Sequence, residues 1–165
     1  MRKIFTVSLI AASLLVQGCS KQAFDPTTGN EPDIEQLYVA AREVDAAILT
    51  GVTYDSYAQK VAAVTAKLLI AQDSGTSDEK RKNLLTRYAL LIDQYRSALS
   101  VWGMGIHNAP GDDPRLLAIQ QKYLIAISED ARKGNATLFE DIRNQIWRLT
   151  VSNETEIVKL VRGRM

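Results

Sequence analysis

Histidine chemistry in this chain is limited, because His107 is its single histidine. The sequence predicts that His107 lies in a loop between Gly105 and Pro110, where no nucleophile stands beside it to form a hydrolytic triad. A serine or aspartate partner from a distant part of the chain is left open. We interpret His107 as an ordinary loop residue that a partner or ligand could contact.

The sequence contains no set of residues that matches a metal or cofactor site. Bundles that hold two iron ions use Glu-x-x-His pairs from two helices, and one histidine cannot supply both. The Cys-x-x-Cys-His sequence for covalent haem is missing, and no cysteine, histidine and carboxylate cluster matches a zinc site. Met104 and His107 would have to reach opposite faces of a haem from one short stretch. We therefore expect no metal and no cofactor.

Charged pairs along the chain fit exposed helix surfaces better than catalytic sites. Glu140 and Asp141 are adjacent, so their side chains on a helix would diverge by about 100°. Carboxylates from separate helices could still converge for glycoside cleavage. The basic run 80–82 follows two acidic residues, which predicts an exposed first turn and a poor site for a polyanion. Without a nucleophile, metal or phosphate motif, we expect a protein that is not an enzyme.

Aromatic residues give more specific candidates for a contact site. Tyr54 and Tyr57 begin one predicted helix, and Tyr38 lies on the helix before it. Such a cluster near the first helical hairpin could bind a ligand ring or a sugar. The alternative, which their helical spacing favours, is that these rings belong to the core.

The stretch Val101–Ile106 is apolar and is interrupted by Gly103 and Gly105. We expect it to leave the end of the third helix and to open the connection to the next one. If Trp102 and Met104 were exposed, the stretch would be a partner-binding patch. If it folds back, it closes the end of the bundle, and we favour this arrangement.

The N-terminus has the pattern of an export signal. Arg2 and Lys3 precede a mostly apolar run, Ile4–Val16, which as a helix would span about 20 Å, short of the roughly 30 Å hydrocarbon core of a membrane. A positive start and an apolar run of this length are typical of a secretory signal peptide. The alternatives are an ordinary secreted protein with an incidental cysteine and a buried N-terminal helix.

The apolar run ends in Val16–Cys19, with the sequence Val-Gln-Gly-Cys, which resembles the lipobox of bacterial lipoproteins. The resemblance covers residues 1–20 and implies that residues 1–18 are removed, that the Cys19 sulfur carries a diacylglyceryl group, and that its new amino group is usually acylated, for example with palmitate. Several acyl chains hold a protein on a membrane far more firmly than one. Ser20 stands where an aspartate would suggest inner-membrane retention in enteric bacteria. In a Gram-negative source, we therefore expect an outer-membrane protein that faces the periplasm.

The rest of the chain predicts a tether and one helical domain. Residues 19–30 are polar and have no apolar period, as in a flexible tether. Apolar residues then recur at steps of three and four over 34–48, 54–68, 84–102, 116–127 and 138–149. The last two runs fit either two helices or one kinked helix. Short joints near residues 51 and 75 predict antiparallel neighbours, so we expect residues 31–165 to form an all-α antiparallel four- to five-helix bundle.

Turn and capping residues predict where these helices begin and end. Gly51 can end the first helix, and Thr53 can cap the second. Thr76 and Thr137 each precede a glutamate by three positions, as in a capping box. Asp113 stands before a proline, which is typical of a helix start.

Overall charge excludes one class of partner. The formal net charge is +1, from 20 basic and 19 acidic residues, and loss of Arg2 and Lys3 with the signal would leave −1. A chain with so few excess charges lacks the basic stripe that is typical of nucleic-acid-binding proteins, so we expect no nucleic-acid partner. The sequence therefore predicts a membrane-anchored envelope lipoprotein that acts, without a cofactor, as a non-enzymatic binding or accessory module for an envelope protein. The alternative is a bundle that binds a small ligand or cofactor through a tyrosine-rich interior. The candidate contact residues are Tyr54, Tyr57, Trp102, Met104 and His107.

Overall fold

The computed structural model describes residues 31–75, 78–127 and 135–162, without the side chains of residues 135, 136 and 162. Cys19, the signal and the tether therefore lie outside the described residues. The described helices are α1 (Pro32–Thr50), α2 (Tyr54–Asp73), α3 (Glu79–Ile106), α4 (Pro114–Tyr123) and α6 (Asn135–Arg162). No strand occurs in these ranges, so the prediction of an all-α bundle is confirmed.

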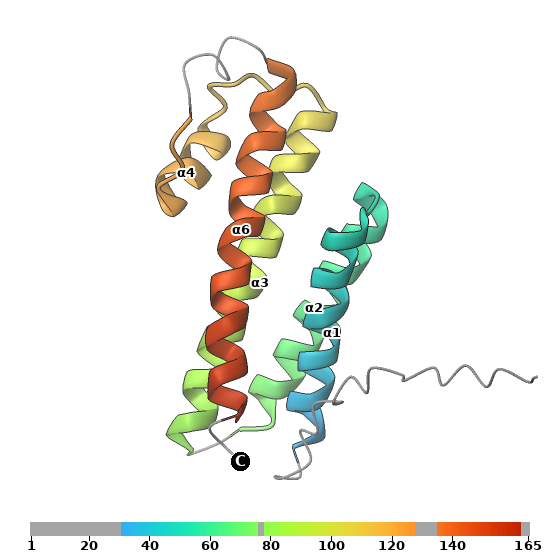
Figure 1. Ribbon diagram of the computed structural model, residues 1–165, viewed down its shortest axis with the longest axis vertical. Coiled ribbons are helices and arrows are strands. Elements are labelled where there is room, and N and C mark those ends of the chain that lie inside the picture. Colours follow the sequence, from blue (N-terminus) through green and yellow to red (C-terminus); the bar gives the residue numbers. More distant parts are fainter. Residues whose placement is uncertain (1–30, 76–77, 128–134, 163–165) are drawn as a thin grey trace, which may run out of the picture.

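The helices form two antiparallel hairpins that pack side by side (Figure 1). One hairpin is α1–α2, and the other pairs α3 with α6, which returns alongside it after the short helix α4. The predicted up, down, up order of the first three helices is confirmed. Helices α3 and α6 continue past the closed end of the α1–α2 hairpin, at residues 51–53, and we call this step in the bundle the shoulder.

Several helix ends follow the predicted capping chemistry. Thr53 accepts a hydrogen bond from the backbone of Ser56 at the start of α2, and Asp113 caps α4 from the position before Pro114. Gly51 takes a φ of +85° after α1, which a side chain would disfavour.

Other boundaries differ from the sequence prediction. Asp78, rather than Thr76, caps α3 by accepting from two backbone N–H groups of its first turn. Thr137 lies inside α6, which begins two residues earlier. Helix α4 ends at Tyr123, where Leu124 takes the left-handed conformation, so Ile127 is not helical. Helices α4 and α6 are therefore separate, which excludes one long kinked helix over 114–162.

Helix α3 does not break at its glycines, so the prediction that the stretch 101–106 leaves the third helix and opens the next connection is wrong. The helix continues through Gly103 and Gly105 to Ile106. A Cβ atom on Gly103 would lie 3.0 Å from the Tyr54 hydroxyl oxygen, and one on Gly105 would lie 3.0 Å from Cβ of Phe139. These glycines therefore serve close helix packing instead of a turn.

The core is the shared interior of the four long helices. It contains the predicted apolar stripes, including the fully buried Leu37, Val44, Val64 and Leu84, and three tyrosines, Tyr57, Tyr88 and Tyr95. Polar pairs within it tie the hairpins together. Asn153 on α6 donates a hydrogen bond to Gln94 on α3 at 2.8 Å, and Tyr95 on α3 donates to Asp45 on α1 at 2.5 Å.

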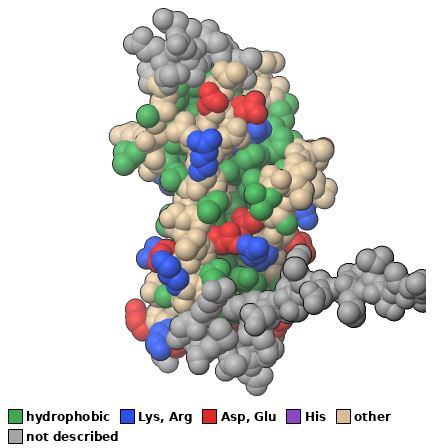
Figure 2. All heavy atoms as spheres, viewed as in Figure 1, with side chains coloured by type: hydrophobic (Ala, Val, Ile, Leu, Met, Phe, Trp, Pro, Cys, Tyr) green, Lys and Arg blue, Asp and Glu red, His purple; other side chains and the backbone are tan. Residues whose placement is uncertain are grey.

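The seam between α6 and the α1–α2 hairpin is visible on one face of the molecule. Figure 2 shows hydrophobic side chains along the upper part of this seam and oppositely charged side chains across its middle. An ion pair between Arg42 on α1 and Glu154 on α6 connects the two hairpins.

Candidate ligand pocket at the shoulder

Four aromatic rings meet where the α1–α2 hairpin ends against α3 and α6. Trp102 on α3 lies 5.8 Å from Tyr54, 6.0 Å from Tyr57 and 5.9 Å from Trp147 on α6, measured between ring centroids. Tyr57 and Trp147 are 5.6 Å apart. Most of these pairs are edge-to-face, an arrangement that is favourable for aromatic quadrupoles. We call these four residues the aromatic cluster.

Hydrogen bonds fix the aromatic cluster to the core. The Trp147 indole N–H donates to the Tyr57 hydroxyl at 3.0 Å, and that hydroxyl donates to the Tyr95 backbone carbonyl at 3.2 Å. Burial raises the pKa of Tyr57 well above its usual value, so the hydroxyl stays protonated and keeps its donor. The chain of contacts connects α6, α2 and α3, and it holds the tryptophan rings in one arrangement.

Arg143 on α6 lies against both tryptophans. Its guanidinium carbon is 4.5 Å from the ring centroid of Trp102 and 4.7 Å from that of Trp147, within the range of cation–π contacts. The side chain is 13% exposed. Its polar contacts with Glu140 and Asn144 are long, at 3.4 Å and 3.5 Å from Nη2, and its Nε is buried without a partner. Burial lowers the pKa of Arg143, although the guanidinium stays charged at neutral pH.

A pocket of about 500 Å³ opens beside this cation at the shoulder. It lies between the last turn of α3, the loop that follows it, and the first turns of α6. Its lining consists of Trp102, Gly105, Ile106, Asn108, Ala109, Phe139, Glu140 and Arg143. Its volume lies within the range of known small-ligand sites, which are mostly apolar with a few placed polar groups.

The loop after α3 forms one rim of the pocket and has its own backbone hydrogen bonds. Asn108 takes a φ of +52°, a conformation that asparagine tolerates better than most residues. Its N–H donates to the Gly105 carbonyl at 3.2 Å, and the N–H of Ala109 donates to the Met104 carbonyl at 2.9 Å. These bonds fold the loop back over the helix end and leave the Asn108 side chain on the rim.

The predicted contact residues have different surroundings. Tyr54, Tyr57 and Trp102 come together in the aromatic cluster, and Trp102 also lines the pocket. Tyr57 is fully buried, and Met104 is buried in the core. His107 is exposed at the C-terminal end of α3 and is not among the residues that line the pocket.

The stretch 101–106 combines both arrangements that the sequence left open. Val101 and Met104 are buried and close the interior, whereas Trp102 and Ile106 line the pocket. Sequence reasoning missed Arg143 and Trp147, although their spacing of four on one helix places them on the same face. Nothing in the sequence indicated that this face meets Trp102.

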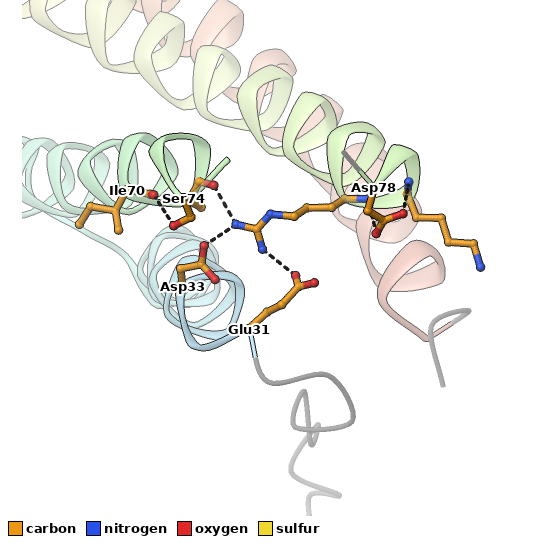
Figure 3. Close-up of polar contacts among 8 residues, drawn as sticks. Glu31, Asp33, Ile70, Ser74 and Asp78 are labelled. Carbon is orange, nitrogen blue, oxygen red and sulfur yellow. Dashed lines mark hydrogen bonds and ion pairs between the residues drawn. The ribbon is translucent and has the colours of Figure 1, made fainter. Parts of the chain in front are cut away.

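A second polar cluster lies at the opposite end of the bundle, around Arg81 (Figure 3). The predicted exposure of the basic run 80–82 is wrong for this residue, which is 5% exposed. Its guanidinium donates to Glu31 at 2.7 Å, to Asp33 in the first turn of α1, and to the Ala71 carbonyl near the end of α2 at 2.8 Å. We call these four residues the Arg81 cluster. It joins three helices where the chain enters the bundle.

Asp33 of the Arg81 cluster keeps its negative charge at neutral pH. Burial raises the pKa of Asp33, but the hydrogen bonds from Arg81 and Ser74 and the Arg81 charge outweigh it, so the net shift is downward. The two terminal nitrogens of the Arg81 guanidinium donate to protein acceptors, while its Nε is buried without a partner. Because two carboxylates of the chain already pair with this cation, the cluster has the features of a structural joint rather than of an anion site.

The described part of the chain contains neither a cluster of metal ligands nor a membrane-spanning helix. Within residues 31–75, 78–127 and 135–162, no group of three or more histidine, cysteine or acidic residues could hold a metal ion. None of the helices in these ranges is long and apolar enough to cross a membrane.

The bundle and its shoulder pocket define the class to which the protein can be assigned, an all-α helical protein. No protein family, curated protein or solved structure significantly matches this chain.

Proposed function

We propose that this protein is a lipid-anchored, non-enzymatic binding module of the cell envelope that holds its partner in the shoulder pocket. The observation that carries the binding role is the pocket itself, in which Trp102 and Phe139 form apolar walls beside the cation of Arg143. The anchor is the proposed lipid on Cys19, which rests on the sequence pattern of residues 1–20.

The position of the pocket suits a tethered module. Residue 31, where the tether would join the bundle, precedes α1, and the shoulder, at which the pocket opens, is at the other end of α1 (Figure 1). Arg81 and Gly105 lie on the same helix, and a rise of 1.5 Å per residue separates them by about 36 Å. A bundle held at residue 31 would therefore present its pocket away from the membrane surface.

The alternative from the sequence, a ligand or cofactor in a tyrosine-rich interior, has less support. Tyr57, Tyr88 and Tyr95 are fully buried by packing. Neither the shoulder pocket nor the hollow at the closed end of the α1–α2 hairpin is lined by any of them.

The binding role can be tested by site-specific photo-crosslinking in cells. A photoreactive residue at Ile106, which is 50% exposed and lines the pocket, should give a discrete crosslinked product. The matched control is Ile70, which is 52% exposed near the end of α2, remote from the shoulder. We expect no such product from Ile70, and we expect Arg143→Met to reduce the product from Ile106. Equal products from both positions, or none from Ile106, would contradict the proposal.

A further inference from the structure

Arg81, which is buried, and Arg143, whose side chain is 13% exposed, differ in how closely carboxylates approach their guanidinium groups. Arg81 makes short bonds to two carboxylates and a carbonyl, although its Nε, like that of Arg143, is buried without a partner. Arg143 has contacts of 3.4 Å and 3.5 Å, which are long beside the roughly 2.7–2.9 Å typical of charged hydrogen bonds. Its nearest carboxylate, on Glu140, is 60% exposed and mostly hydrated. Arg143 therefore retains donor capacity that its protein neighbours do not use.

The guanidinium of Arg143 is also held in position. Its guanidinium carbon lies against the rings of both Trp102 and Trp147, and a hydrogen bond to Tyr57 fixes Trp147 in turn. A planar arginine held in this way loses little further conformational freedom when it binds a bidentate anion. This geometry suits a carboxylate, which accepts two parallel N–H bonds.

The other residues of the pocket determine which chemical group it accepts beside the carboxylate. Ile106, Ala109, Phe139 and the face of Trp102 supply apolar surface, and Asn108 adds an amide on the rim. Among the described residues that line the pocket, Arg143 is the one arginine and none is a lysine, and Glu140 contributes a negative charge. This charge balance disfavours a polyphosphate and fits a single negative charge on an apolar body.

We infer that the shoulder pocket binds an apolar group that bears one carboxylate, with Arg143 as the carboxylate receptor and Trp102 and Phe139 as the apolar walls. This inference rests on the proposed binding function and names its ligand class. Two sources share this chemistry, the C-terminal residue of a peptide and a small organic acid.

Three probes separate these sources from each other and from apolar binding alone. They are an N-acetylated tripeptide that ends in phenylalanine with a free carboxylate, the same tripeptide as its C-terminal amide, and 3-phenylpropionate. Titration into the purified chain can be followed by tryptophan fluorescence, because both tryptophans contact Arg143. We expect the acid tripeptide to bind at least about tenfold more tightly than its amide, the loss that a charged hydrogen bond typically gives.

Variants of the pocket charges provide the controls. Arg143→Met should abolish the preference for the acid over the amide, whereas Arg148→Met, at an exposed arginine of the same helix, should not change it. Because Arg143 is mostly buried, a second variant replaces a more exposed residue instead. Glu140→Gln should tighten binding of the acid tripeptide a few-fold, since it removes a carboxylate that competes for Arg143. Asp141→Asn, at the exposed neighbour, should have no effect.

Each outcome decides part of the inference. Tight binding of 3-phenylpropionate, equal to that of the acid tripeptide, would assign a small acid as the source, and weaker binding would assign a peptide C-terminus. Equal affinity for acid and amide, an unchanged preference in Arg143→Met, or no binding of any probe would overturn the carboxylate assignment. If the Ile106 crosslink persists in that case, the proposed binding function stands and only the carboxylate ligand is rejected.

Discussion

Asp45 is a buried carboxylate whose charge is only partly stabilised. Its Oδ1 accepts from the Tyr95 hydroxyl, while its Oδ2 is buried without a partner. Burial raises the pKa of Asp45, and this effect outweighs the hydrogen bond from Tyr95 and the charge of Arg42, which lower it. The folded state therefore binds the proton more tightly than the unfolded state does. Stability from this group is greatest below the unfolded pKa and falls as the pH rises through the raised pKa.

We predict that Asp45→Asn becomes more favourable relative to the native protein as the pH rises. Asparagine keeps an acceptor for Tyr95 and carries no charge, and each unit by which the pKa is raised corresponds to about 1.4 kcal/mol. The measurement is the free energy of unfolding of both proteins at pH 4 and pH 7. The exposed control Asp141→Asn should show no such change. A difference between Asp45→Asn and the native protein that is the same at both pH values would contradict this account.

At the scale of helices, the two glycines of the last turns of α3 allow different neighbours to approach. The atom nearest to a Cβ on Gly103 is the hydroxyl at the far end of Tyr54, which is half-buried and can shift. The atoms nearest to a Cβ on Gly105 are Cβ and Cγ of Phe139, which are fixed to the backbone of α6. The second contact can be relieved only by moving one helix away from the other.

We predict that Gly105→Ala destabilises the protein by about 1–2 kcal/mol, because overpacking outweighs the helix propensity that alanine adds. Gly103→Ala should stay within about 0.5 kcal/mol of the native protein, because the Tyr54 ring can give way. Urea denaturation of both variants measures the difference. A Gly105→Ala protein as stable as Gly103→Ala would show that α3 and α6 are not held at this distance.

The helices themselves were largely predictable, because apolar residues at steps of three and four mark the buried face of each one. The end of α3 was not, since Gly103 and Gly105 read as helix breakers unless their neighbours are known. The burial of Arg81 was hidden for a similar reason. Its partners come from positions 31, 33 and 71, and local sequence does not show that these positions meet. The pocket depends on such long-range contacts throughout, so the sequence indicated Trp102 but not Arg143.

For the whole molecule, the proposed lipid on Cys19 would hold the bundle at a membrane surface. We predict that Cys19→Ser moves the protein from the membrane fraction to the soluble fraction, because no acyl chain can then be attached to this position. Ser20→Ala is the matched control and should stay with the membrane. Fractionation followed by intact-mass measurement checks both the location and the lipid. Membrane association that is unchanged in Cys19→Ser would contradict the anchor.

The Arg81 cluster has a mechanical consequence for a protein held by its N-terminal side. Tension on the chain ahead of residue 31 would reach Glu31 and Asp33 first, and Arg81 would pass it directly to α3 and, through the Ala71 carbonyl, to α2. The load is thus shared by three helices before the first turn of α1 can unravel. If the chain is held by the proposed lipid on Cys19, a pull along the tether would therefore act on α1, α2 and α3 together, at the end of the bundle that lies opposite the pocket.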